Sequence, residues 1–269
     1  MMIRFLLEWK NRLIQDRVMD LAAQLAYYFL LSLFPFLFLS FSVLGYLPFS
    51  SEHVLELVRP YAPPSTYELI RSNLVHILDQ QNGKALWLSI LASLYLASLA
   101  FQSMIRALNR AYRVKVTRPF WADMVLGYFL MFGLFIALVI SLILPIFGKI
   151  IGEALFLILG LTPTFFKIWN LIRWLLSSLV LGFVFLCLYI FAPNTKVSIY
   201  QALPGTLLAT VGWQIISYGF SYYVSINDYS QLYGNLGGIM ILVGWFYFSA
   251  LIVIVGGQLN AILCQWRKN

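Results

Sequence analysis

Charged residues, cysteines and histidines are scarce in this sequence. Charged residues make up 10% of the 269 residues and hydrophobic residues 61%, whereas soluble domains contain about 25% charged and roughly 45–50% apolar residues. A water-soluble fold could not bury so much apolar surface. The composition therefore excludes a soluble domain and predicts a bundle of transmembrane helices.

The cysteines and histidines limit the chemistry open to the chain. Cys187 and Cys264 lie in or beside different apolar stretches without C-x-x-C spacing, and His53 and His76 lie in one polar stretch. This pattern favours neither a disulfide framework nor a histidine-rich metal site. The sequence also lacks a nucleophile elbow, a P-loop and an H-E-x-x-H motif. We therefore expect a protein that is not an enzyme, with no catalytic residues, no metal and no cofactor.

The net charge of +8 has a topological explanation in a membrane protein. Lys and Arg accumulate in cytoplasmic loops, where they also face anionic lipid headgroups. We therefore expect membrane lipids, and not nucleic acid, as partners of this charge.

Long apolar runs separated by polar segments predict an all-α integral membrane protein with six transmembrane helices. Such a bundle leaves no room for a separate soluble domain, so residues 1–269 are expected to form one multi-pass membrane domain. Residues 1–20 do not fit a signal peptide, because charged residues interrupt every apolar run, and their helical spacing predicts an interfacial helix. The predicted spans cover residues 21–47, 85–105, 124–147, 171–191, 203–224 and 236–263.

The distribution of positive charge predicts the orientation. The 18 Lys and Arg residues fall mostly at the two ends of the chain, between spans 2 and 3, and between spans 4 and 5. The smaller share lies in the longer connections of the opposite side. Because cytoplasmic segments carry the excess, both termini are expected in the cytoplasm.

Four features interrupt the simple bundle. Residues 50–84 have apolar positions at rough helical spacing and predict two amphipathic helices on the outer face. Residues 149–167 are apolar but broken by glycine and proline, so a re-entrant and an interfacial segment both stay open. Pro35 is expected to kink span 1 near Ser32, and Pro204 is expected in the first turn of span 5.

Polar residues in the first two spans are candidates for a substrate cavity, because polar groups at membrane depth are costly unless paired or hydrated. Asp20, at the mouth of span 1, either caps the helix or takes part in binding a substrate or proton. Gln24 lies one turn further along. The candidates from this part of the chain are Asp20, Gln24, Tyr27, Ser32, Pro35, Gln102 and Asn109.

Three arginines at the end of span 2 form a candidate lipid-phosphate rim. Arg106, Arg110 and Arg113 are spaced four and three residues apart, which stacks them on one helix face. Such a face can bind lipid phosphate groups. Positive-inside topology explains the same residues.

Spans 5 and 6 are the most polar and aromatic. Tyrosines here are typical of an interfacial belt, and their number is also compatible with a polar-lined cavity. The candidates are Gln214, Tyr218, Asn227, Tyr229, Tyr233, Gly234, Gln258 and Asn260. Gly257 and Ala261 form a small-x-x-x-small pair that fits internal packing and homo-oligomer contacts equally well.

Five segments of the chain resemble the BrkB/YihY-like family of bacterial membrane proteins. They are A-Y-Y-F-L-L-S-L-F-P (26–35), A-L-N-R-A-Y-R-V (107–114), L-P-G (203–205), Y-S-Q-L-Y-G-N-L (229–236) and G-G-Q-L-N-A (256–261). The resemblance covers almost the whole chain. It implies a six-span fold in the bacterial inner membrane, virulence or serum-resistance labels, and suggestions of lipid or solute export.

The family has also carried a ribonuclease label, and this sequence departs from the family at one position. We reject the label for this sequence, which offers neither a metal cluster nor a soluble basic groove for RNA. The family commonly has an acidic residue where this chain has Gln258, which argues against ion coupling through that position.

Together these patterns favour a transporter or flippase-like protein that moves a lipid-related or amphipathic molecule across the bacterial inner membrane. The cavity is expected among spans 1, 2, 5 and 6. The alternative is an envelope scaffold that moves nothing and uses the outer segment 50–84 for interactions.

Overall fold

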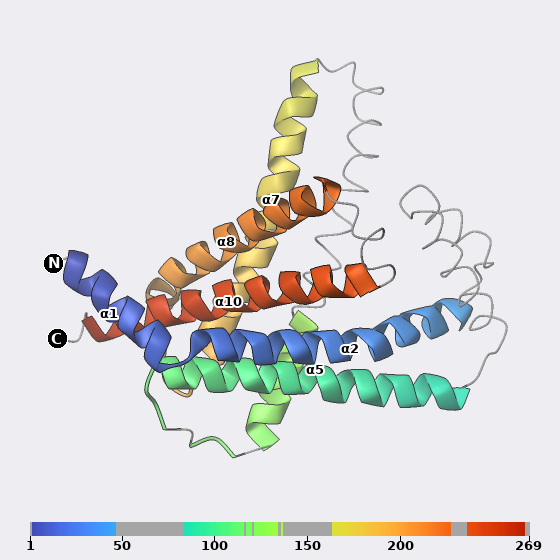
Figure 1. Cartoon of the computed structure of the whole chain (residues 1–269), viewed down its shortest axis with the longest axis horizontal. Helices are drawn as coiled ribbons and strands as arrows, with labels where there is room; N and C mark the ends of the chain where they lie inside the picture. The colour runs from blue at the N-terminus through green and yellow to red at the C-terminus, as the bar shows by residue number, and fades with distance from the viewer. Residues whose placement is uncertain are drawn as a thin grey trace. The chain divides into compact units, whose positions relative to one another are not determined.

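A computed structural model of the chain describes residues 2–46, 83–115, 117–119, 121–133, 136, 163–226 and 236–266. Every regular element among these residues is a helix, which confirms the all-α prediction (Figure 1). The helices are α1 (Met2–Gln15), α2 (Val18–Tyr46), α5 (Gly83–Ala111), α7 (Pro163–Phe191), α8 (Ile199–Ile226) and α10 (Leu236–Trp266), with a shorter apolar helix, Trp121–Gly133.

The described helices overlap the predicted spans but begin and end at different residues, and residues 137–147 of the third predicted span lie outside the described residues. α7 begins at Pro163, a residue suited to a first turn because its missing N–H needs no partner there. The end of the predicted 149–167 segment is therefore helical. Residues 149–162 and 50–82 lie outside the described residues, so the predictions for them stay predictions.

Three helices among the described residues are long and apolar enough to cross a membrane. They are Ile90–Ala111, Lys167–Phe191 and Gly237–Trp266. α8 has 28 residues, a length of about 42 Å at 1.5 Å per residue, but its glutamines, serines and tyrosines lower its hydropathy. The described residues thus support a membrane protein, while the count of six spans stays a prediction.

The chain groups into two compact units. One contains residues 1–27 and 98–269, and the other contains residues 28–97. The second unit consists of the later part of α2 and the first part of α5. In it α2 continues through Pro35, and the Ser32 hydroxyl donates a hydrogen bond to the Phe29 carbonyl at 2.9 Å.

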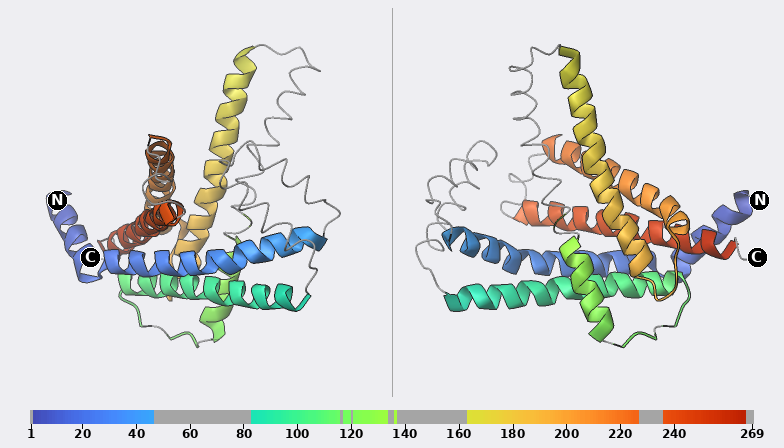
Figure 2. Two further views of the ribbon diagram at one scale, coloured as in Figure 1. Left: turned by 45° about the vertical axis from the view of Figure 1, so that its right-hand side comes forward. Right: turned by 180° about the vertical axis from the view of Figure 1, so that it is seen from behind.

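The first unit is built around α8. α8 runs beside α10 and also packs against α7 (Figures 1 and 2). α1 contacts α10 near the C-terminal end of that helix. Small residues on the contact faces, among them Ala202, Ala209 and Ala261, are fully buried, which lets the helix backbones approach closely.

The prediction that Pro204 lies in the first turn of span 5 was wrong. α8 begins at Ile199, so Pro204 lies inside the helix. The Gln201 side chain caps this start, because the Ser198 backbone N–H donates to its Oε1 at 2.9 Å, which is one of the two bonds of a capping box. Asn260 of α10 then bonds the backbone around the proline: Gly205 N–H donates to its Oδ1 at 2.6 Å and its Nδ2 donates to the Ala202 carbonyl at 2.9 Å.

Candidate functional site

A cavity of about 1050 Å³ lies along helix Trp121–Gly133, α7 and α8. Ligand pockets are typically about 300–1,000 Å³, so this one is large enough for a sizeable molecule. Its walls are mostly apolar, with Phe129, Trp174 and Phe183 among them, and none of the described lining residues is charged. Such a surface fits a hydrocarbon chain and offers nothing to neutralise a buried charge.

Three polar residues at four-residue spacing place a polar strip on the α8 wall of this cavity. They are Thr206, Thr210 and Gln214, which share one helix face. Gln214 Nε2 donates to Ser178 Oγ of α7 at 2.6 Å, and the Thr206 hydroxyl donates to the Ala202 carbonyl. Thr210 Oγ1 is buried and has no hydrogen-bond partner among the described residues, so its hydrogen-bonding capacity is unused.

The position of this cavity differs from the expected one. Its described walls come from the predicted spans 3, 4 and 5, and among the described candidate residues Gln214 alone lines it. Sequence reasoning missed Thr206 and Thr210, although their four-residue spacing ahead of Gln214 was a readable signal.

A second cavity, of about 670 Å³, lies between α8 and α10 and is also apolar. Its lining includes Phe220, Tyr223, Met240 and Phe248. Tyr218 is 78% exposed and lines neither of these two cavities. Exposed tyrosines on a membrane helix fit the belt interpretation better than the cavity one.

The crossing of α8 and α10 is very close at Gly205 and Gly256. A Cβ atom at Gly205 would lie less than 3.0 Å from the Gly256 carbonyl oxygen and from the Asn260 side-chain amide. The buried Tyr189 of α7 donates its hydroxyl to the Val253 carbonyl at 2.6 Å. Asn260 is therefore a structural residue in a three-helix junction, and not part of either cavity.

Gln258 is paired with a carboxylate that sequence reasoning missed. Gln258 is 1% exposed, and its Nε2 donates to Asp16 Oδ2 at 2.6 Å. Asp16 itself is 8% exposed and lies between α1 and α2, where Arg17 has a φ of 49°. Asp16 is one of the charged residues that interrupt the apolar runs of residues 1–20, and no local pattern marks it as buried.

Asn109, in the last turns of α5, belongs to a polar network that joins the loop after α5 to the loop after α7. Its Oδ1 accepts the Asn194 backbone N–H at 2.6 Å. The Asn194 side chain donates to the Lys115 carbonyl and to Thr117 Oγ1. The Arg118 guanidinium donates to the carbonyls of residues 191, 192 and 193 at the end of α7. This geometry assigns Asn109 a structural role.

The three arginines of the predicted lipid-phosphate rim do not line one pocket together. Arg106 and Arg110 are exposed on α5, whereas Arg113 has a φ of 55° just after that helix. Arg113 Nη2 donates to Gln15 Oε1 of α1 at 3.3 Å. The turn therefore directs the Arg113 side chain toward α1, so Arg113 does not share a helix face with Arg106 and Arg110 as the sequence suggested.

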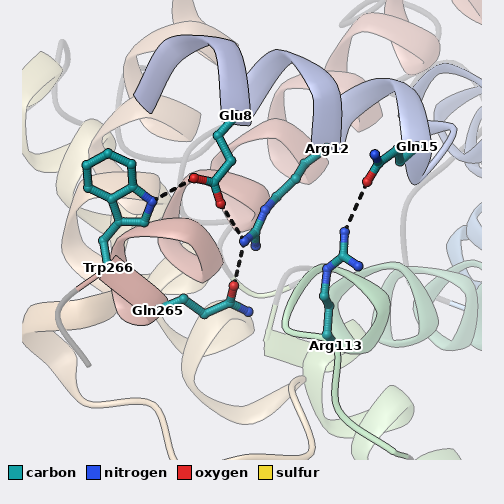
Figure 3. Close-up of polar contacts among 6 residues, drawn as sticks. All are labelled: Glu8, Arg12, Gln15, Arg113, Gln265 and Trp266. Carbon is teal, nitrogen blue, oxygen red and sulfur yellow. Dashed lines mark hydrogen bonds and ion pairs between the residues drawn. The ribbon is translucent and has the colours of Figure 1, made fainter. Parts of the chain in front are cut away.

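Figure 3 shows how α1 is fixed to the end of α10. Arg12 Nη2 donates to Glu8 Oε1 at 2.8 Å and to Gln265 Oε1 at 2.6 Å, and Trp266 Nε1 donates to Glu8 Oε2 at 3.0 Å. The hydrogen bond from Trp266 and the Arg12 guanidinium hold the pKa of Glu8 below its ordinary value. Glu8 is thus ionised at neutral pH and its two oxygens are both engaged.

The remaining candidate residues come from several parts of the chain. Asp20 and Gln24 are exposed in the first turns of α2. At this position the helix dipole stabilises the negative charge of Asp20. Gln102 is half-buried on α5. Four candidates, Asn227, Tyr229, Tyr233 and Gly234, lie outside the described residues. Tyr27, Ser32 and Pro35 follow along α2.

Groups that could hold a metal ion are not found among the described residues, where no three His, Cys, Asp or Glu side chains gather. Both histidines lie outside this part of the chain. Cys187 and Cys264 are free thiols. Burial raises the pKa of the Tyr112 phenol, which keeps that hydroxyl neutral.

Comparison with known proteins places the chain among membrane proteins. Residues 10–269 match the family model described as Virulence factor BrkB. The chain is 40% identical over 265 residues to the putative ribonuclease-like protein YfkH of Bacillus subtilis (strain 168), covering 98% of this chain and 96% of that protein. It is 30% identical to UPF0761 membrane proteins of Tolumonas auensis (99% and 87% covered) and Aliivibrio fischeri (98% and 84% covered). No solved structure matches the chain.

The family match covers nearly the whole sequence, and the relatives are covered over most of their own length. The apolar helices agree with a membrane-embedded family. The chain therefore belongs to the BrkB family of membrane proteins.

Proposed function

We propose that this protein moves a lipid-related, amphipathic molecule across the bacterial inner membrane. The observation that carries the proposal is the cavity along helix Trp121–Gly133, α7 and α8. Its apolar walls suit an acyl chain, and its single polar strip suits the less apolar part of the same molecule. Thr210 supplies a buried hydroxyl with no partner of its own.

The proposal includes six spans with both termini in the cytoplasm. The excess of Lys and Arg in the terminal segments supports this orientation. The contacts of Arg12 with Gln265 and of Trp266 with Glu8 hold the N-terminal helix against the end of the last helix, and an even number of crossings is needed for this. Membrane-impermeant labelling of single cysteines at positions 3 and 268 would test the orientation.

Transport without a chemical step is favoured over RNA hydrolysis. The ribonuclease-like name of the Bacillus subtilis relative would require a surface that binds a polyanion, which needs clustered Lys and Arg. The described lining of the cavity along α7 and α8, on which the transport proposal rests, contains no charged residue, so this cavity does not suit a polyanion. The scaffold alternative depends on residues 50–84, of which 50–82 lie outside the described residues, and it stays a prediction.

The test is the movement of a fluorescent phospholipid between the leaflets of proteoliposomes. Gly133 lines the cavity, and a Cβ there would meet nothing within 4 Å, so Gly133→Trp can fill the space without displacing the backbone. We expect this variant to abolish lipid movement. Thr210→Val removes the unpartnered hydroxyl at nearly constant shape and should slow movement without lowering stability.

Gly238→Trp is the matched control, since Gly238 also has nothing within 4 Å and lines neither apolar cavity. It should move lipid as the wild type does. Undiminished movement in Gly133→Trp would show that the cavity is not the route. A wild-type protein that moves no lipid would rule out the transport proposal and favour the scaffold.

A further inference from the structure

A polar cavity of about 460 Å³ lies beside α1. It lies apart from the two apolar cavities and shares no lining residue with them. Its polar lining residues are Arg4, Glu8, Asn11, Arg12, Gln15 and Arg113. Three guanidinium groups, one carboxylate and two amides therefore face one space.

Positive charge exceeds negative charge in this cavity. Glu8 is the one acidic residue in the described lining, and both of its oxygens accept bonds from Arg12 or Trp266. The carboxylate therefore neutralises at most one of the three guanidinium groups. The surplus charge of Arg4 and Arg113 attracts an anion into the space between α1 and the end of α5.

Arg12 has donor capacity that the described structure leaves unused. Its Nη2 makes the two bonds to Glu8 and Gln265, whereas its Nη1 is buried without a hydrogen-bond partner. The side chain is only 12% exposed. A buried guanidinium N–H calls for an acceptor, and the oxygens of a phosphate group suit the planar fork of arginine.

The apolar face of α1 indicates where the anion comes from. Leu7 lines the cavity, and Leu6, Leu7 and Ile14 are exposed by 50–64% of their surface. Leucine and isoleucine beside arginines on a short helix are typical of a segment at the membrane interface. At that depth the nearest phosphate groups belong to phospholipid headgroups, and arginine near an anionic surface gains further attraction.

We propose that this cavity binds the phosphate group of an anionic phospholipid headgroup, with Arg4, Arg12 and Arg113 as its ligands. This site goes beyond the proposed transport function and does not depend on it, because a lipid held here anchors α1 whether or not the protein moves lipid. Arg113 reaches the site through its left-handed backbone conformation and its contact with Gln15.

Lipid binding to the purified full-length protein, followed by native mass spectrometry, tests the site. The probes are phosphatidylglycerol, phosphatidylcholine and inorganic phosphate. The variant is Arg4→Gln with Arg113→Gln, which leaves the structural bonds of Arg12 in place. We expect phosphatidylglycerol to bind more tightly than phosphatidylcholine, and the double variant to weaken phosphatidylglycerol binding about tenfold or more.

Arg106→Gln with Arg110→Gln is the matched control, because it removes the same charge from exposed residues that do not line the cavity. It should bind phosphatidylglycerol almost as the wild type does. Equal weakening in both double variants, or none in either, would overturn the site. Displacement of the lipid by inorganic phosphate at a similar concentration would overturn the lipid assignment and favour free phosphate. If the Arg4 and Arg113 double variant does not fold, Arg4→Gln alone is compared with Arg106→Gln under the same criteria.

Discussion

Replacing Gly205 by alanine should disrupt the junction where α8 meets α10. The added methyl group would lie less than 3.0 Å from the Gly256 carbonyl oxygen, which is backbone, and from the Asn260 amide. Neither neighbour can move freely, since Asn260 is fully buried and bonded on both sides of Pro204. Relief therefore requires the two helices to separate or Asn260 to leave its position.

The magnitude follows from three contributions. Overpacking a tight interior costs about 1–3 kcal/mol, and losing the two Asn260 hydrogen bonds costs about 0.5–1.5 kcal/mol each. Alanine in a helix interior is favoured over glycine by about 1 kcal/mol, which offsets part of the loss. We expect Gly205→Ala to lower the free energy of unfolding by about 1–5 kcal/mol.

Gly219→Ala in the same helix is the control, because a Cβ there would meet nothing within 4 Å. It should leave stability unchanged or raise it by up to about 1 kcal/mol. The assay is thermal unfolding of the detergent-solubilised protein, followed by circular dichroism and by the monodisperse fraction on size exclusion. Equal stability of the two alanine variants would refute the close approach of α8 and α10.

Three further predictions concern polar contacts. Gln258→Leu should lower the free energy of unfolding by about 1.5–3 kcal/mol, the value of a hydrogen bond to a charged group, because Asp16 loses the donor at 2.6 Å; unchanged thermal unfolding would contradict this. Arg118→Ala should speed amide hydrogen exchange at the C-terminal end of α7, where three carbonyls lose a donor, and exchange as slow as in the wild type would argue against the cap. The pKa of Glu8 is lower in the folded protein than its ordinary value of 4.5. The contribution of ionised Glu8 to the free energy of unfolding is therefore complete above pH 4.5 and is lost as the pH falls through the lowered pKa. A stability measurement against pH should show this loss in the wild type and not in Glu8→Gln, and identical curves would disprove the role of the Trp266 bond.

Some local features of the fold could be read from the sequence and were in part overlooked. The helices in the described parts of the predicted spans follow from long apolar runs, and the helical conformation of α1 follows from the spacing of apolar residues in 1–20. The early start of α8 was also readable, since Ser198 and Gln201 have the spacing of a capping box. The prediction for Pro204 was wrong because it rested on the preference of proline for a first turn and left out the capping residues before it.

The roles of the candidate residues could not be read in the same way. Gln214 was identified and lines a cavity, whereas Asn109 and Asn260 have structural hydrogen bonds and Tyr218 is exposed. A polar residue at membrane depth needs a partner in every case. Whether that partner is a backbone carbonyl, another side chain or a bound molecule depends on the neighbouring helix, which a single sequence does not identify.

The sequence by itself determined the all-helical class, the membrane environment and the family, because hydropathy and helical periodicity act over short stretches of chain. Only the tertiary structure decided which polar groups meet. Asp16 and Gln258 are separated by 242 residues, and Arg12 and Gln265 by 253. Such pairs form because unpaired polar groups are costly in an apolar interior, and helix packing determines which partner lies within reach.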